Sequence, residues 1–190
     1  MTAKEELLEI ALKLFTEEGY ESTGVAAIVQ AAGVTKPTLY HHFGNKEGLL
    51  SSLIESYGTG LKKVFTETLT YQGDIIGALD QMVIAYMHYI KKNPMFFKLY
   101  KQLYQSPQGS DSYRIVSPLN TQIDGEVRRF FEHVAAHHTG LKGKEAWMAF
   151  SLIGLMDTYM LHHMNNGQWE QISDDTCRQV AKQFLYGVFS

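Results

Sequence analysis

The chain has 190 residues, and 17 lysines and arginines against 20 aspartates and glutamates give it a formal net charge of -3. Hydrophobic residues make up 45% of the chain and charged residues 19%, a composition that excludes a disordered or fibrous protein. A single cysteine, Cys177, excludes an intramolecular disulfide and a metal site built from several thiolates. No apolar run approaches the roughly 18 to 20 residues that cross a bilayer, and the glutamate-rich N-terminus does not resemble a signal peptide. We therefore expect a cytoplasmic protein.

Charge is unevenly distributed along the chain. Residues 1–21 carry two lysines and six glutamates, whereas the last 140 residues are balanced. Residues 22–50 carry two lysines against one glutamate, together with the adjacent His41 and His42. A basic surface, if the chain has one, is therefore predicted to be small and to lie within residues 22–50.

Apolar residues recur at helical spacing, and strict alternation of apolar and polar residues is hard to find. The N-terminal part predicts three short helices. The first ends at Gly19 and is marked by one apolar stripe of Leu7, Ile10, Ala11, Leu14 and Phe15. The second runs for about two turns after Thr23 and ends at Gly33. The third has Thr35 as its N-cap and stops at Gly44.

From residue 46 onward the predicted helices are longer and rich in methionine and aromatic residues. Glycine, proline and asparagine breakers separate six of them, at 46–70, 74–92, 94–105, 112–139, 143–166 and 173–189. The sequence thus predicts an all-α protein of about nine helices. The change in character near Gly44 predicts two helical regions, residues 1–46 and 47–190.

Residues 22–46 have the layout of a helix-turn-helix, with a two-turn helix, a tight turn and a second short helix. Leu39 and Phe43 are predicted to face inward, which leaves a polar face of Lys36, Pro37, Thr38, Tyr40 and His41. Short polar side chains suit base edges in the major groove of DNA, and Tyr, His and Lys reach phosphates. The N–H groups at the start of both helices, at Thr23 and Thr35, can hold a phosphate. A small surface helix that only packs is the alternative, so the pattern by itself leaves DNA binding open.

The stretch from Ala11 to Leu50 closely resembles the DNA-binding domain of the TetR family of bacterial transcriptional repressors. Matching residues stand in register at Phe15, Gly19-Tyr20, Thr23, Ile28, Ala32-Gly33-Val34, Thr35-Lys36, Leu39-Tyr40-His41-His42-Phe43 and Lys46-Glu47. The rest of the chain matches only in length and helical layout. The resemblance implies a helix-turn-helix DNA-binding domain over residues 1–46 (the head) and a helical ligand-binding and dimerisation domain over residues 47–190. It also implies a regulator, usually a repressor, that binds a palindromic operator as a dimer and is released by a small effector.

Carried over by position, the resemblance assigns two groups of DNA-binding residues in the head. Those closest to base edges are Lys36, Pro37, Thr38 and Tyr40. Those closest to phosphates are Thr23, Thr35, His41, His42 and Lys46. The second helix begins Val25-Ala26-Ala27, where relatives often have a polar residue or an arginine, so its share of base recognition is predicted to be small. With so few cations, DNA affinity should depend only weakly on salt.

The predicted helix at 46–70 joins the head to the rest of the chain and contains Gly48, Gly58 and Gly60. Each mid-helix glycine costs about 1 kcal/mol relative to alanine, so this helix is predicted to be soft. In one interpretation Gly58 and Gly60 form a bend through which the head tilts. In the other, they let a neighbouring helix pack closely.

Aromatic and methionine residues concentrate in the helices predicted at 74–105 and 143–166. Such stripes are usually protein core, but methionine and tyrosine surfaces also suit a pocket for apolar ligands. The candidate effector-binding residues are Tyr86, Phe97, Tyr100, Tyr104, Trp147, Phe150 and Asp157. Asp157 is a carboxylate within an apolar helix, and it faces solvent, pairs across an interface, or meets a polar or cationic ligand. Composition favours a small, largely apolar effector.

The last two predicted helices, 143–166 and 173–189, carry apolar residues on more than one side, for example Leu152, Leu155, Phe184 and Val188. Helices too apolar for the surface of a monomer indicate self-association. We therefore expect a homodimer through residues 143–189. Two heads about 34–36 Å apart would then meet successive turns on one face of DNA.

His133 and His137 lie four residues apart on one predicted helix, a spacing that can hold a metal ion, and His138, His162 and His163 lie in the same region. There is no H-E-x-x-H, no cysteine cluster and no clear third ligand, so no metal or other cofactor is expected. A metal-responsive regulator using these histidines, or a helical hydrolase, remains the alternative. The sequence has no Gly-rich phosphate loop, no G-x-S-x-G motif and no carboxylate pair placed by a motif, so an enzyme is not predicted.

Overall fold

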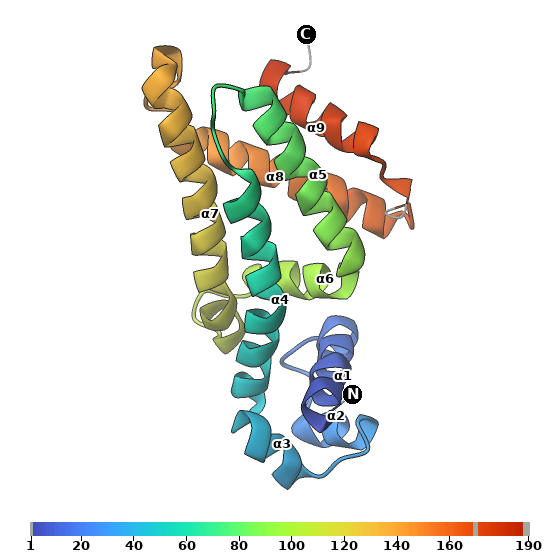
Figure 1. Ribbon diagram of the computed structural model, residues 1–190. Coiled ribbons are helices and arrows are strands. Elements are labelled where there is room, and N and C mark those ends of the chain that lie inside the picture. Colours follow the sequence, from blue (N-terminus) through green and yellow to red (C-terminus); the bar gives the residue numbers. More distant parts are fainter. Residues whose placement is uncertain (1, 169–170, 188–190) are drawn as a thin grey trace. The chain divides into compact units, whose positions relative to one another are not determined.

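The computed structural model describes residues 2–168 and 171–187 (Figure 1). In chain order its helices are α1 (Ala3–Glu18), α2 (Val25–Ala31), α3 (Lys36–Phe43), α4 (Lys46–Thr68), α5 (Ile75–Lys92), α6 (Pro94–Tyr104), α7 (Asp111–His137), the short 3-10 helix η1 (Thr139–Leu141), α8 (Glu145–Asn165) and α9 (Asp174–Tyr186). These two described ranges contain no strand, so the predicted all-α fold is confirmed. None of their helices is long and apolar enough to cross a membrane.

The helix boundaries follow from local signals in the sequence. Thr2 caps α1 in a reciprocal box with Glu5, as its side chain accepts from the Glu5 N–H and the Glu5 side chain accepts from the Thr2 N–H. Thr35 is the N-cap of α3, and Gly44 ends that helix with a positive φ of 77°, a conformation that favours glycine. The last helix ends at Tyr186, before the predicted residue 189, and Val188 lies outside the described residues.

Contacts divide the chain into two compact units. Unit 1 consists of Met1–Thr59 and Asn93–Asn120, and unit 2 consists of Gly60–Lys92 and Thr121–Ser190. Unit 1 therefore contains α1 to α3, the first part of α4, α6 and the start of α7. The predicted division at residue 46 follows chain order rather than contacts, and it stays a prediction.

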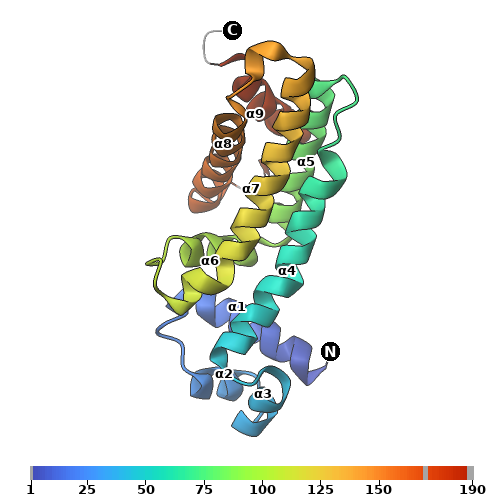
Figure 2. The same ribbon diagram turned by 90° about the vertical axis from the view of Figure 1, so that its left-hand side faces the viewer.

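The core of unit 1 forms where α1, α2 and α3 meet (Figure 2), and Leu7, Phe15, Ile28 and Leu39 are fully buried there. Helix α6 packs on α1 within the same unit. The hydroxyl of Thr16 on α1 donates to the carbonyl of Leu12 at 2.6 Å and lies 3.3 Å from the carbonyl of Met95 at the start of α6. The head is therefore packed against α6 by both apolar and polar contacts.

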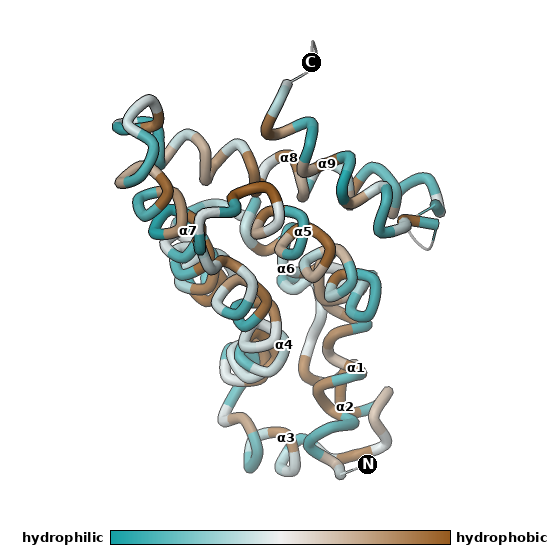
Figure 3. Tube along the Cα trace, turned by 45° about the horizontal axis from the view of Figure 1, so that its top comes forward, coloured by the Kyte–Doolittle hydropathy of each residue, from teal (hydrophilic) through white to brown (hydrophobic). Residues whose placement is uncertain are grey.

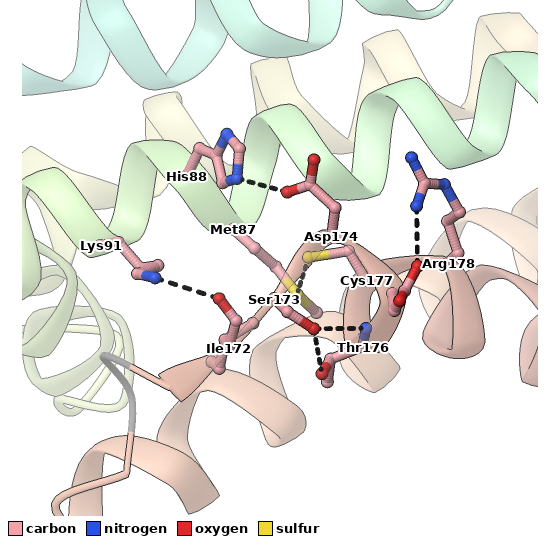
Figure 4. Close-up of polar contacts among 10 residues, drawn as sticks. Met87, His88, Lys91, Ile172, Ser173, Asp174, Thr176, Cys177 and Arg178 are labelled. Atoms are coloured by element: carbon pink, nitrogen blue, oxygen red, sulfur yellow. Dashed lines mark hydrogen bonds and ion pairs between the residues drawn. The ribbon is translucent and has the colours of Figure 1, made fainter.

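The core of unit 2 forms largely between α5 and α9. Figure 4 shows the polar contacts that flank it: a nitrogen of His88 lies 2.8 Å from a carboxylate oxygen of Asp174, and Lys91 donates to the carbonyl of Ile172 at 3.0 Å. Between them the Cys177 thiol contacts the sulfur of Met87. Burial, followed by the nearby Asp174 carboxylate, raises the pKa of the Cys177 thiol to about 11. This cysteine is therefore a packing residue rather than a reactive one.

Candidate nucleic-acid interface and effector region

The helix-turn-helix is built from α2, a turn and α3. Gly33 takes a positive φ of 64° in that turn, and the Val34 N–H donates to the Val29 carbonyl at 3.0 Å. Leu39 is fully buried and Phe43 is 8% exposed, so α3 packs through the two residues predicted to face inward. This arrangement holds the opposite side of α3 in solvent.

The exposed side of α3 brings together most of the predicted DNA-binding residues. Exposed side chains are those of Thr35, Lys36, Pro37, Tyr40, His41 and His42, and Thr38 is half-buried. The hydroxyls of Thr35 and Thr38 lie 2.9 Å apart. Tyr40 is 47% exposed, which leaves its phenol free to reach a base or a phosphate. We call this set the α3 face.

Helix α2 adds one polar residue that the sequence reasoning did not single out. Gln30 is exposed on α2, beside the exposed methyl groups of Ala26, Ala27 and Ala31. A glutamine amide can pair with the major-groove edge of adenine, and alanine methyls can contact thymine methyls. The position of Gln30 on the first helix of a helix-turn-helix is the feature of the sequence that could have identified this residue.

The placement of Thr23 corrects one predicted phosphate contact. Its side chain is 1% exposed, and both its hydroxyl and its N–H donate to the carbonyl of Gly19, at 2.8 and 3.2 Å. Helix α2 takes Gly24, not Thr23, as its N-cap. Both donors of Thr23 therefore hold the turn after α1 and are not directed at a ligand.

Lys46, another predicted phosphate contact, is half-buried and is held by contacts within unit 1. Its ammonium donates to the carbonyls of Tyr20 at 2.9 Å and Thr23 at 3.2 Å, and it lies 3.5 Å from that of Glu21. The same ammonium lies 4.2 Å from the centre of the Tyr20 ring. Lys46 thus joins the first turn of α4 to the turn between α1 and α2, and a phosphate contact would require breaking this site.

Acidic residues surround the Tyr20 hydroxyl within unit 1. The pKa of the Tyr20 hydroxyl is raised to about 12, mainly by burial. The carboxylates of Glu47, Glu21 and Asp111 raise the pKa further. Arg114 on α7 lies 2.8 Å from Asp111 and 3.3 Å from Glu47. The start of α7 is therefore linked to the first turn of α4 by the ion pair between Arg114 and Glu47.

The two glycines of the proposed bend lie in close contact with other helices. A methyl group added at Gly58 would lie 2.8 Å from a methyl carbon of Leu119 on α7, within unit 1. One added at Gly60 would lie 2.8 Å from the ring of Tyr89 on α5, within unit 2. Close packing therefore accounts for both glycines, and their action as a bend stays a prediction.

The predicted effector-binding residues do not form one cluster. Phe97, Tyr100 and Tyr104 lie on α6 in unit 1, where Phe97 and Tyr100 are buried. In unit 2 the hydroxyl of the buried Tyr86 donates to the carboxylate of Asp157, so α5 and α8 meet at this pair. Asp157 is thereby satisfied inside the protein.

Trp147 and Phe150 on α8 are 72% and 73% exposed. Trp147 borders an open groove of about 700 Å³ in unit 2, together with Ile75, Phe131, Leu141, Lys144, Met148, Ser151, Leu155, Gln183, Phe184 and Leu185. The opposite side of α8 is buried through Ala149, Leu152, Met156 and Met160. Helix α8 thus has apolar residues both in the core and in solvent. Figure 3 shows that many residues of α9 are hydrophilic.

The histidines do not form a metal site in the part of the chain that the structure describes. No group of three or more His, Cys, Asp or Glu side chains there is placed to hold a metal ion. His133, His137 and His138 instead surround the ring of Tyr71, whose hydroxyl lies 2.7 Å from a nitrogen of His138. This geometry gives the metal-responsive alternative no support.

Comparison with known proteins places these observations in a family. Residues 7–53 match the family described as bacterial regulatory proteins, tetR family. The biofilm operon icaADBC HTH-type negative transcriptional regulator IcaR of Staphylococcus aureus is 23% identical over 131 residues, 68% of this chain and 69% of that protein. The HTH-type transcriptional repressor KstR2 of Rhodococcus jostii is 28% identical over 118 residues, 62% of this chain and 58% of the repressor.

Solved structures share the fold along the whole chain. The MbdR regulator from Azoarcus sp. CIB superposes with a TM-score of 0.80 at 16% identity and covers 100% of both chains. The TetR family transcriptional regulator PfmR from Thermus thermophilus superposes with a TM-score of 0.72 at 23% identity. This match covers 97% of the present chain and 99% of PfmR. The matched proteins are transcriptional regulators and not enzymes. Residues 7–53 thus match the tetR family of bacterial regulatory proteins, and the chain as a whole has the fold of a TetR family transcriptional regulator.

Proposed function

We propose that this regulator is a repressor that binds a palindromic operator in the cytoplasm as a homodimer and leaves it when a small, largely apolar effector binds. The observation that carries the DNA-binding part is the α3 face, which gathers a cation, hydroxyls, a phenol and two imidazoles on one short exposed helix. Repression is supported by the similarity to IcaR, a negative transcriptional regulator, and to KstR2, a transcriptional repressor.

The α3 face divides into two roles. Lys36, Pro37, Thr38 and Tyr40 contact base edges, with Gln30 of α2 beside them. Thr35, His41 and His42 contact phosphates, and the first N–H groups of α3 add donors at a positive helix end. Thr23 and Lys46 take no direct part, because their donors are used within the head.

The dimer forms through α8 and α9. Large apolar side chains on the outer side of a helix are normally covered by a partner, and the core of the protomer covers only the other side of α8. Exposed aromatic rings beside an apolar groove are typical of an interface anchor. A twofold axis brings one patch against a copy of itself, so Trp147 and Phe150 of one protomer meet α8 and α9 of its partner.

The effector is small and largely apolar, and its binding weakens DNA affinity. Support comes from the aromatic residues that line the interiors of both units, among them Tyr86 in unit 2 and the stacked rings of Phe96 and Tyr100 in unit 1. Native mass spectrometry of the purified protein, before and after unfolding and refolding, reveals an effector retained from the expression host.

The DNA-binding proposal is tested with labelled double-stranded DNA from upstream of the protein's own gene. Fluorescence anisotropy at fixed salt should show sequence-specific binding that Tyr40→Ala weakens at least about tenfold, the effect of losing about 1.4 kcal/mol of contact. Met95→Ala is the matched control, because Met95 is also exposed in unit 1 but lies on α6. Equal affinities for wild type and Tyr40→Ala would contradict the assignment of α3.

The dimer proposal is tested by the solution mass of the wild type and of Phe150→Asp. The charge introduced at the interface centre should convert dimer to monomer, whereas Met95→Asp should leave the dimer intact. A Phe150→Asp protein that stays dimeric at nanomolar concentration would show that the dimer forms elsewhere.

A further inference from the structure

The turn between α1 and α2, residues 19–24, determines where the helix-turn-helix begins. Gly24 is the N-cap of α2, and both donors of Thr23 hold the carbonyl of Gly19. Helix α2 packs on α3, so a change in the conformation of this turn reorients α2 and, with it, the α3 face. We call residues 19–24 the α1–α2 turn.

Two helices that follow the helix-turn-helix in the chain hold the α1–α2 turn. From α4, Lys46 donates to the carbonyls of Tyr20 and Thr23, at 2.9 and 3.2 Å. From α7, the hydroxyl of Ser112 donates to a carboxylate oxygen of Glu21 at 3.3 Å. All of these residues belong to unit 1. The turn is therefore held from two helices within one compact unit.

Ser112 makes its contact from a well-packed position. Its side chain is 2% exposed. The hydroxyl of Ser110 lies 3.0 Å from that of Ser112 and is itself fixed, because it donates to the carbonyl of Pro107 and accepts from the Tyr113 N–H. A hydroxyl that donates to a carboxylate makes a charge-assisted hydrogen bond. Ser112 thus offers Glu21 a donor whose position is set by the start of α7.

Arg114 joins the same start of α7 to α4. Its guanidinium lies 3.3 Å from a carboxylate oxygen of Glu47, the residue after Lys46 in the first turn of α4. The two side chains are 67% and 46% exposed, and exposed ion pairs contribute little to stability. Arg114 therefore adds a small bias to the arrangement of α4. We call the contacts of Ser112 with Glu21 and of Arg114 with Glu47 the α7 contacts.

We propose that Ser112 and Arg114 are positioning residues for DNA binding, which act through the α7 contacts to hold the α1–α2 turn in the arrangement that presents the α3 face to an operator. The inference rests on the proposed function and gives a role to residues outside the helix-turn-helix. Helix α7 runs without interruption from Asp111 to His137 and continues into unit 2. Two heads that must meet half-sites at a fixed spacing need such a link, because a head that turns freely loses selectivity between spacings.

The size of the effect is set by the weakness of the contacts. A contact that favours one orientation of the head by a given factor changes the apparent affinity by at most that factor for each head. An exposed ion pair supplies a factor of about two to five. Removing both α7 contacts should therefore weaken binding to a correctly spaced operator by about threefold to tenfold.

The first experiment is hydrogen exchange of the free protein, read by mass spectrometry. The double variant Ser112→Ala/Arg114→Gln should exchange the backbone amides of residues 19–24 at least about threefold faster than the wild type, with no change in α5. Arg128→Gln is the matched control, because Arg128 also lies on α7 but pairs with Glu132 of the same helix. Unchanged exchange of the α1–α2 turn in the double variant would overturn the inference.

The second experiment measures selectivity between half-site spacings. The upstream DNA that the wild type binds is lengthened or shortened by one base pair at the centre of its palindrome, and affinities are measured by anisotropy at fixed pH and salt. The wild type should discriminate strongly between the three fragments. The double variant should bind the original fragment about threefold to tenfold more weakly and lose most of this discrimination. Arg114→Lys, which keeps the positive charge, should retain the wild-type preference.

The outcomes separate the inference from the proposed function. If Ser112 and Arg114 only stabilise the fold, the double variant will have a lower urea midpoint but the wild-type preference between spacings, and the inference is overturned while DNA binding stands. Absence of specific binding by the wild type to any of the fragments would instead overturn the proposed function.

Discussion

The Lys46→Met substitution separates a structural role of Lys46 from the phosphate contact that its position in the sequence suggests. Methionine keeps most of the length and apolar surface of the side chain but removes the ammonium. The change deletes the hydrogen bonds to the carbonyls of Tyr20 and Thr23, at 2.9 and 3.2 Å, and the contact with the Tyr20 ring. Those carbonyls lie in the turn that fixes α2 relative to α1.

The loss can be estimated from these contacts. A hydrogen bond from a charged donor contributes about 1.5 to 3 kcal/mol, and a cation over an aromatic ring about 0.5 to 1 kcal/mol at an exposed site. Lys46 is half-buried, so water replaces part of what is lost. We expect the free energy of unfolding to fall by about 2 to 3 kcal/mol.

The assay is urea denaturation at fixed protein concentration, since the stability of a dimer depends on concentration. The urea midpoint should fall with little change in slope. The salt slope of DNA binding, measured on the protein that remains folded, should match the wild type. Lys36→Met is the control and should behave in the opposite way, with unchanged stability and a slope reduced by about 0.9 for each head. A Lys46→Met protein of wild-type stability and reduced salt slope would refute this account of Lys46.

Three further predictions follow from buried groups and close contacts. Gly58→Ala should destabilise the protein by about 1 kcal/mol, because overpacking against Leu119 exceeds the gain in helix propensity. The control Gly125→Ala, with open space at its Cβ within α7, should stabilise the protein by about 0.5 to 1 kcal/mol. Equal urea denaturation midpoints for the two variants would contradict this prediction. Thr23→Val should cost about 1 to 2 kcal/mol in thermal or urea unfolding through the lost hydrogen bond to Gly19, with no change in the salt slope of DNA binding. Because burial raises the pKa of the Cys177 thiol to about 11, the thiol stays neutral in the folded protein at pH 8. It should therefore react with a thiol reagent only as fast as the protein unfolds. Rapid labelling of the folded protein would be inconsistent with the buried position of Cys177.

Much of the fold could be predicted because its determinants are local. Thr35 and Gly44 bracket α3 in the sequence as they do in the structure, and Leu39 and Phe43 are the residues that it buries. Apolar spacing and single breaker residues also placed the long helices from α4 to α8 within two residues. Periodicity reports which side of a helix is apolar, and for α8 it correctly indicated more than one side.

The parts of the site that depend on contacts between residues far apart in the sequence could not be predicted from local sequence signals. Lys46 looks like a free cation in the sequence, because the carbonyls that bind it belong to a turn more than 20 residues earlier. Thr23 looks like an N-cap, but the chain folds its hydroxyl back onto Gly19. Trp147 and Phe150 have the composition of core residues, and only the packing of α8 shows that their rings are exposed.

The central claim is that two copies of this chain bind one palindromic site through the α3 face. The most direct test is native mass spectrometry of the protein, refolded free of ligand, on DNA fragments that tile the region upstream of its gene. The account predicts a complex of one dimer, or a pair of dimers, on a short palindrome, and its loss in Tyr40→Ala. The refolded protein failing to form any specific complex at low salt, or binding as a monomer, would contradict it.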